Sequence, residues 1–264
     1  MKKSSKDQEW FREFYVEELT ELVGFPSPEA TEQQVRFVLD KLMLPHQAKI
    51  LDLCCGYGRV THLLSRDKKY QITGFDLSED FLEIARSEFS SPNIKYVQGD
   101  IRKLPFKNEF DAVVNLFTSF GYFDSDEENE KILTQINKAL KKGGLFLLDY
   151  ENKFNFVMNE VMKKKRSWYN TRNHQLYLIE NEYDFVKERE IVTFRQYKDG
   201  FIVKQVCYNI RLFSFPELEK MLARNGFEIL QRWGDFEGGP LTVESKRVIT
   251  LSRKVTPGKK SKPQ

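Results

Sequence analysis

The segment ILDLCCGYGRVTHLLS, residues 50–65, constrains the fold of this chain more than any other. A short apolar run ends in a turn of small residues, and the spacing of the next apolar side chains predicts a helix over 58–64. Glycines at 56 and 58 allow the backbone of such a turn to approach a ligand, because no Cβ intervenes. A strand, a glycine turn and a helix in this order predict a nucleotide-type site at the carboxyl end of a parallel strand.

Strands and helices alternate along the first 150 residues. Apolar runs bounded by turn residues predict strands at 49–53, 70–76, 94–100, 111–117 and 145–150. Helical spacing and capping residues predict helices at 7–23, 28–43, 58–64, 78–89 and 126–141. This alternation implies right-handed crossovers and a parallel sheet that is covered by helices on both faces.

The pattern changes after the fifth strand. Extended segments rich in Tyr, Ile, Val and Phe occur at 176–184, 190–197 and 201–213, and Asp199-Gly200 is typical of a tight hairpin between the last two. A helix at 215–224 and strands at 227–233 and 247–252 close the chain. The predicted fold is a Rossmann-like, doubly wound α/β sheet of seven strands, with an inserted small antiparallel sheet and N-terminal helices.

This organisation divides the chain into an N-terminal helical cap, a ligand-binding domain in two segments, an inserted sheet and a basic disordered tail. These parts are residues 1–44, residues 45–152 with 214–254, residues 153–213, and residues 255–264. The net charge is +3, but the first six and last twelve residues carry eight cations and no acid, so the remainder carries −5. Basic ends on an acidic body are more typical of solvated termini than of a nucleic-acid tether.

The composition predicts a cytoplasmic protein without a membrane partner or a metal. No apolar run approaches the roughly 18 residues that span a bilayer, and no apolar stretch follows the first lysines as it would in a signal peptide. The three cysteines, Cys54, Cys55 and Cys207, form no C-x-x-C pair, and only three histidines occur. Neither a structural zinc site nor a thioredoxin-type redox site is therefore expected.

The glycine turn differs from two familiar phosphate-binding motifs. The dinucleotide fingerprint G-x-G-x-x-G lacks its last glycine here, and no G-x-x-x-x-G-K-[ST] occurs. Instead, Asp52 precedes a small-x-Gly-x-Gly turn, Asp76 ends the second strand 18 residues after Gly58, and Asp100 ends the third. This set resembles the class I S-adenosylmethionine-dependent methyltransferases over about residues 50–152.

The resemblance implies a role for each of these residues. Gly56 and Gly58 would pass under the methionine and ribose parts of the cofactor, Asp76 would accept the ribose hydroxyls, and Asp100 with the Ile101 amide would read the adenine edge. Cys54 stands where this family most often has glycine, so a slightly bulkier turn with retained binding is expected. The full predicted set for S-adenosylmethionine and its product S-adenosylhomocysteine is Asp52, Cys54, Gly56, Gly58, Asp76, Leu77, Asp100, Ile101, Asn115 and Tyr15.

The segment after the fourth strand, residues 115–129, borders the transferred methyl group in the family. The predicted acceptor-binding residues are Phe117, Phe120, Tyr122, Trp168 and Tyr208, and Tyr122 is the candidate catalytic residue. Simple core packing is an equally good explanation for each of the aromatic residues that follow the fourth strand. The adenine-N6 signature Asn/Asp-Pro-Pro-Tyr/Phe is missing at 115–118, and Cys207 lies too far along the chain for a cytosine-C5 nucleophile.

The predicted function is methyl transfer to a small-molecule acceptor by in-line displacement. One alternative is a non-catalytic S-adenosylmethionine-binding or partner protein, and another is an RNA- or protein-directed methyltransferase. The inserted sheet is expected either to roof the active site and set acceptor choice or to form a homodimer.

Overall fold

The structure is a computed structural model that describes residues 26–67, 69–162, 166–170 and 176–255. For residue 160 and residues 166–170, only the backbone is described. The predicted helix at 7–23, Tyr15 and most of the basic tail lie outside the described residues. None of the helices in the described ranges is long and apolar enough to cross a membrane.

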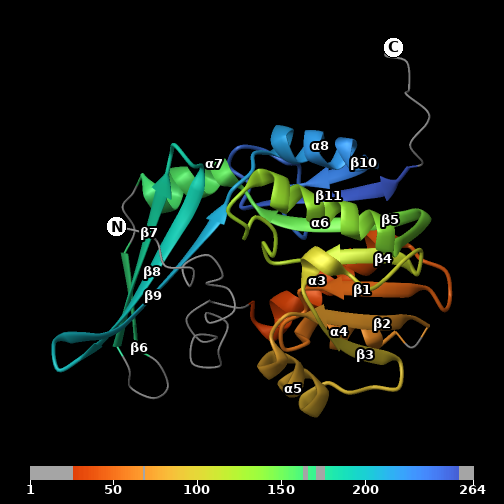
Figure 1. The fold of residues 1–264 in the computed structure, drawn as a ribbon, viewed down its shortest axis with the longest axis horizontal. Helices are drawn as coiled ribbons and strands as arrows, with labels where there is room; N and C mark the ends of the chain where they lie inside the picture. Colours follow the sequence, from red (N-terminus) through yellow and green to blue (C-terminus); the bar gives the residue numbers. More distant parts are fainter. Residues whose placement is uncertain (1–25, 68, 163–165, 171–175, 256–264) are drawn as a thin grey trace.

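A mixed sheet of seven strands forms the main body (Figure 1). Its strands are β1 (Lys49–Leu53), β2 (Gln71–Asp76), β3 (Ile94–Gln98), β4 (Phe110–Asn115), β5 (Leu140–Glu151), β10 (Phe227–Trp233) and β11 (Arg247–Lys254). Their order is β10-β11-β5-β4-β1-β2-β3, with β11 antiparallel to both of its neighbours and the other pairs parallel. The chain order reverses between β1 and β4, which is where open α/β sheets bind ligands. The predicted fold class is confirmed.

Successive side chains of each strand point to opposite faces of the sheet, and helices cover both faces. The helices are α3 (Pro28–Leu42), α4 (Arg59–Ser65), α5 (Glu79–Glu88), α6 (Asp126–Ala139) and α8 (Phe215–Arg224). Ile50 of β1 packs in a core cluster with residues of α3 and α4, whereas Leu51 packs in a second cluster with residues of α6 and α8. The two clusters cover the two faces of the sheet, which leaves the carboxyl ends of its strands open for a site.

Two of the strand boundaries that differ from the sequence prediction have a clear structural basis. β5 begins at Leu140 and not at residue 145, so Gly143 and Gly144 lie inside the strand, and its register with β4 shifts between Phe110 and Ala112. β4 ends at Asn115, two residues early, because Phe117 and Thr118 have φ values of 61° and 57°. Such left-handed backbone cannot continue a strand.

Residues 153–213, called the insert from here on, form a separate antiparallel sheet beside the main body (Figure 1). Its strands are β6 (Arg166–Asn170), β7 (Leu176–Asp184), β8 (Arg189–Lys198) and β9 (Phe201–Arg211), in the order β6-β7-β8-β9. The sequence prediction missed β6 and also the helical turns α7 (Lys153–Phe156) and η3 (Val157–Val161). The carboxyl ends of the parallel strands face the side on which the insert stands (Figure 1).

The base of the insert is bonded to residues 116–125, the β4–α6 loop. The Arg211 amide donates to the Gly121 carbonyl at 2.8 Å, and the Arg189 guanidinium donates to the Phe123 carbonyl at 3.1 Å. Arg211 also forms ion pairs with Glu188 at 2.6 Å and Glu217 at 2.7 Å. Hydrogen bonds therefore hold the insert on the loop that follows β4, and the ion pair with Glu217 ties it to α8.

Gly121 is the tightest point of this junction. Its φ is +97°, and a Cβ at this residue would lie 2.4 Å from the Arg211 carbonyl oxygen. Gly121→Ala is expected to lower the free energy of unfolding by about 2–4 kcal/mol, measured by urea denaturation. Gly143→Ala is the matched control, because Gly143 has φ +74° with nothing within 4 Å. That control bears only the left-handed backbone cost of about 1–2 kcal/mol, and equal losses in both variants would contradict the contact.

Candidate active site

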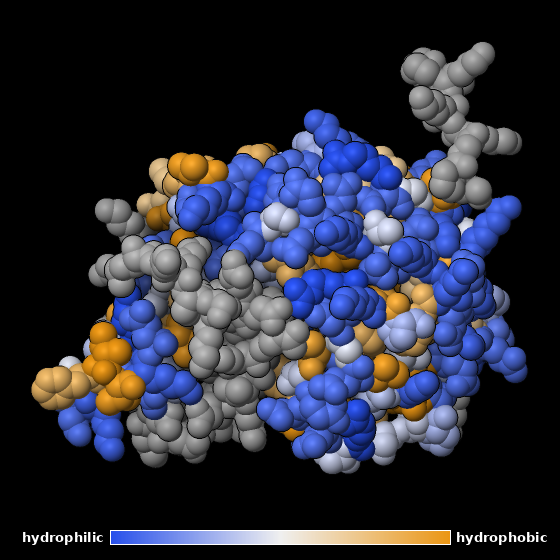
Figure 2. All heavy atoms as spheres, in the orientation of Figure 1, coloured by the Kyte–Doolittle hydropathy of each residue, from blue (hydrophilic) through white to orange (hydrophobic). Residues whose placement is uncertain are grey.

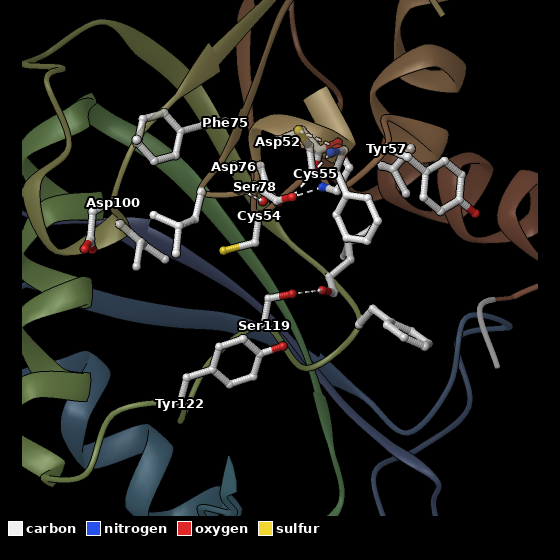
Figure 3. Close-up of a pocket in the computed structure, with 18 of the residues that line it drawn as sticks. Asp52, Cys54, Cys55, Tyr57, Phe75, Asp76, Ser78, Asp100, Ser119 and Tyr122 are labelled. Carbon is white, nitrogen blue, oxygen red and sulfur yellow. Dashed lines mark hydrogen bonds between the residues drawn. The ribbon is translucent and has the colours of Figure 1, made fainter. Parts of the chain in front are cut away.

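A cavity of about 270 Å³ opens at the carboxyl ends of β1, β2 and β4 (Figure 3). One wall is formed by the turn after β1 and by the residues that follow β2 and β3, and the opposite wall is formed by the β4–α6 loop. In Figure 3, Ser119 and Tyr122 lie across the space from Asp76 and Cys54. The glycine turn therefore borders a cavity at the point of the sheet where the strand order reverses, between β1 and β4.

The end of β2 shapes the turn after β1. The Phe75 carbonyl accepts the Cys54 amide at 2.8 Å and the Cys55 amide at 3.1 Å. The Asp76 carboxylate accepts the Gly56 amide at 2.7 Å and the Ser78 amide at 3.0 Å. Burial raises the pKa of Asp76, and these backbone hydrogen bonds oppose the rise. A carboxylate has about four lone-pair sites, so Asp76 retains capacity to accept from a ligand.

The two glycines of the turn serve different purposes. Gly56 has φ +55° and lines the cavity, and an added Cβ would meet nothing nearer than Phe81 at 4.0 Å. Gly58 has φ +89°, and its added Cβ would lie 2.7 Å from the Tyr96 hydroxyl and 3.0 Å from the Ala85 Cβ. Gly58 does not line the cavity, so it is required by the packing of α4 on α5 and β3.

Cys54 and Cys55 are free thiols whose pKa values are raised well above the ordinary range, chiefly by burial. Cys54 has φ +61°, in the left-handed region that favours glycine. Its side chain faces the cavity in Figure 3. A thiol that stays protonated is a poor nucleophile and a poor metal ligand. No group of three or more potential metal ligands occurs among the described residues.

Asp52 is a buried acid beneath the same turn. Its side chain accepts the Thr61 hydroxyl at 2.6 Å, and burial raises its pKa to about 6 even though the nearby Arg59 charge opposes the shift. Asp100, at the end of β3, accepts the Arg102 amide at 2.9 Å. The cavity therefore has acids at three successive strands, as the sequence predicts.

A buried ion pair supports the opposite wall. Asp149 of β5 accepts the Phe117 amide at 2.8 Å through its carboxylate and the Thr118 amide at 3.2 Å through its carbonyl. Arg247 of β11 pairs with Asp149 at 2.6 Å and donates to the Thr118 hydroxyl at 2.8 Å. The sequence prediction missed both residues, although an acid inside the apolar run LFLLDY was a visible signal.

Comparison with known proteins places the chain in a family. Residues 50–144 match the model of the "Methyltransferase domain" family. A ubiquinone/menaquinone biosynthesis C-methyltransferase of Wigglesworthia glossinidia brevipalpis is 31% identical over 186 residues, which are 68% of this chain and 66% of that protein. A glycine/sarcosine N-methyltransferase of Aphanothece halophytica is 25% identical over 87% of this chain and 84% of its own length.

A solved structure shares the whole fold. The S-adenosylmethionine-dependent methyltransferase of Clostridium acetobutylicum ATCC 824 superposes with a TM-score of 0.73 at 20% identity, covering 89% of this chain and 95% of that one. The shared fold, the matched domain and the row of acids at the strand ends agree. The chain is a class I S-adenosylmethionine-dependent methyltransferase. The non-catalytic and RNA- or protein-directed alternatives gain no support from these relatives.

The methyltransferase brings most of the predicted site residues to one cavity. Its lining includes Asp52, Cys54, Gly56, Asp76, Leu77, Asp100, Ile101, Phe117 and Tyr122. The cavity does not include Gly58, Asn115, Phe120 or Tyr208. The side chains of Tyr15 and Trp168 lie outside what the structure describes. The lining residues that the sequence prediction missed include Tyr57, Arg59 and Ser119.

Three of the predicted residues have a packing role instead. Asn115 is buried, and its amide donates to the Leu53 carbonyl at 2.9 Å, tying β4 to β1. Phe120 is a core residue in ring contact with Phe213 at 5.6 Å. Tyr208 packs against Phe194 on the insert. Sequence position after a strand cannot tell a cavity-facing side chain from the next one, which points into the core.

The residues of the cavity fit S-adenosylmethionine, the cofactor of the family. Asp76 and Asp100 are carboxylates at adjacent strand ends, suited to the ribose diol and the adenine edge. None of the described residues that line the cavity is a lysine, which agrees with a cationic cofactor that carries no phosphate.

Asp76→Ala is expected to weaken the binding of S-adenosylhomocysteine by about 1.5–3 kcal/mol, the range for a hydrogen bond to a charged group. The variant also frees the Gly56 amide, so the loss should fall at the upper end of that range. Isothermal titration measures the affinity, and circular dichroism checks the fold. Glu83→Ala, an exposed acid on α5, is the matched control. Unchanged affinity in Asp76→Ala would show that Asp76 only caps the turn.

Asp52→Asn is expected to stabilise the unliganded methyltransferase at pH 8. The pKa of the Asp52 carboxyl is about 6 in the folded protein and 3.8 ordinarily, so burying the ionised carboxylate costs folding free energy at high pH. Removing it should raise the free energy of unfolding by about 1–3 kcal/mol. This gain in the free energy of unfolding should shrink as the pH falls through 6 and vanish near 4. Urea denaturation across this range measures it, and a pH-independent difference would contradict the assignment.

Proposed function

We propose that this methyltransferase methylates an amine nitrogen of a small molecule. The observation that carries the proposal is the division of the cavity lining. Among the described lining residues, the acids lie on the cofactor side, whereas the β4–α6 loop contributes Leu116, Phe117, Ser119, Tyr122 and Phe123. No carboxylate or imidazole from the described residues faces the acceptor end as a general base. A neutral amine attacks with its lone pair and needs no base, whereas a hydroxyl must lose a proton as it reacts.

The β4–α6 loop positions the acceptor. When bound, S-adenosylmethionine supplies a methyl group that its sulfonium activates. The rings of Phe117 and Phe123 exclude water from the acceptor end, and the Tyr122 and Ser119 hydroxyls orient the amine in line with the methyl group. The Ser119 hydroxyl donates to the Leu116 carbonyl at 3.0 Å, so its lone pairs face the acceptor as hydrogen-bond acceptors. The nitrogen then releases its extra proton to solvent.

Some relatives methylate nitrogen. The glycine/sarcosine N-methyltransferase aligns with 87% of this chain, so its similarity includes the insert region, and that is compatible with an amine acceptor. A cytoplasmic location and a small soluble acceptor are compatible with the proposed methylation of an amine. The acidic body of the chain gives no reason to propose a nucleic-acid partner.

We further propose that the insert roofs the active site and sets acceptor choice. Its base is bonded to Gly121 and Phe123 of the loop that lines the cavity. The alternative role, a homodimer contact, is suggested by the hairpin tip between β8 and β9, where Phe201, Ile202 and Val203 are exposed (Figure 2, far left).

A panel assay tests the acceptor class. The protein is incubated with S-adenosylmethionine and small amines, alcohols or catechols, and S-adenosylhomocysteine is quantified by chromatography. Turnover is expected with amines only, rising with pH as the acceptor ammonium deprotonates. Tyr122→Phe should lower kcat/KM by about 5- to 10-fold, the cost of one hydrogen bond, without changing the affinity for S-adenosylhomocysteine. Tyr208→Phe is the matched control, since Tyr208 lies outside the cavity; turnover with catechols alone would refute the proposal.

Trimming the insert tests its role. Residues 195–205 are replaced by an Asn-Gly turn, which leaves Arg189 and Arg211 on the main body. The affinity for S-adenosylhomocysteine is expected to stay within about twofold, while kcat/KM for an acceptor amine falls at least tenfold. Sedimentation velocity measures the oligomeric state of the same variant. Full turnover with a change from dimer to monomer would assign the tip to the dimer contact instead.

A further inference from the structure

Arg59 is a cavity residue to which the family resemblance assigned no role. It is the first residue of α4 and directly follows Gly58. One end of its guanidinium, Nη1, donates to the Thr31 hydroxyl at 3.0 Å and to the Gln34 side-chain oxygen at 3.1 Å, both on α3. The guanidinium carbon lies 5.6 Å from the centre of the Phe117 ring. Arg59 is therefore held between three elements, with its remaining donors available to the cavity.

Among the described residues, Arg59 has hydrogen-bond partners but no ion-pair partner. Burial lowers the pKa of Arg59, and no carboxylate of the described residues lies within ion-pair distance of it. By contrast, Arg102, Arg211 and Arg247 each contact a carboxylate directly. A partly buried cation that hydrogen-bonds only to neutral oxygens would be stabilised further by a bound anion.

The charged residues at the carboxyl ends of the strands indicate which anion Arg59 would bind. Asp100 follows β3, Asp76 ends β2, and the pair of Asp52 and Arg59 lies at β1 and the start of α4. If adenine lies at β3 and ribose at β2, the amino-acid end of the cofactor reaches β1 and β4. That end carries both a carboxylate and an ammonium, and this corner of the cavity offers both a guanidinium and an acid.

We propose that Arg59 binds the α-carboxylate of S-adenosylmethionine and S-adenosylhomocysteine. Arg59 would then anchor the far end of the cofactor and, through its contact with Phe117, hold the acceptor wall beside it. A guanidinium matches a carboxylate through charge-assisted hydrogen bonds, and the hydrogen bonds to α3 fix its orientation in advance. This assignment rests on the cofactor and not on the acceptor proposed above.

Two ligands distinguish carboxylate binding by Arg59 from a purely structural role of Arg59. S-adenosylhomocysteine carries the carboxylate, whereas its decarboxylated analogue keeps the adenosine, the thioether and the amine. Isothermal titration of both ligands into the full-length protein gives their dissociation constants. Arg59→Gln is expected to weaken S-adenosylhomocysteine about 10- to 100-fold and the analogue less than about twofold. Arg59→Lys, which keeps the charge but loses the planar group, should lie between wild type and Arg59→Gln for S-adenosylhomocysteine.

Arg66→Gln is the matched control, because Arg66 also ties α4 to α3, through Glu32 at 3.0 Å, but lies outside the cavity. It should leave the affinity for both ligands unchanged. Equal weakening of both ligands in Arg59→Gln would overturn the proposal, since Arg59 would then act only by supporting α3 and Phe117. Unchanged affinity for S-adenosylhomocysteine would also overturn it and would leave an acceptor carboxylate as the source of the anion. Because both measurements concern cofactor binding, neither outcome depends on the acceptor class.

Discussion

The cofactor turn depends on the end of β2. The Phe75 carbonyl and the Asp76 carboxylate together accept three successive amides of the turn after β1, those of Cys54, Cys55 and Gly56. The turn is thereby held in its ligand-ready shape, including the left-handed backbone of Cys54. An ionised carboxylate has about four lone-pair sites, so Asp76 keeps capacity for a ligand while it accepts the Gly56 and Ser78 amides.

The acceptor wall has its own support, independent of that turn. Asp149 and Arg247, from neighbouring antiparallel strands, hold Phe117 and Thr118 in two consecutive left-handed conformations. Strained backbone of this kind persists only where surrounding contacts determine it, and it often marks functional segments. The insert adds a second clamp through Arg189 and Arg211. The two walls of the cavity are thus positioned by separate polar networks.

Much of the fold and half of the site were predictable. The alternation of strands and helices, the glycine turn and the acids at strand ends are local signals, and they correctly indicated the seven-stranded sheet and the positions of Asp52, Asp76 and Asp100. The predictions failed where a side chain's direction depended on distant packing. Asn115 and Phe120 belong to the segment that borders the cavity, yet one bonds the Leu53 carbonyl and the other fills the core.

The sequence alone determined the cofactor class, because the ligand-binding turn and the strand-end acids are each encoded within a few neighbouring residues. Only the tertiary structure decided why Gly58 is glycine, since the Tyr96 hydroxyl that would meet its Cβ comes from another strand. The same holds for the Asp149–Arg247 pair, whose members lie 98 residues apart, and for Arg59, whose contacts with α3 and with Phe117 of the β4–α6 loop appear only in the folded structure. Charges and backbone conformations that arise from contacts between distant segments leave no periodic pattern in the chain, so they appear only when those segments pack together.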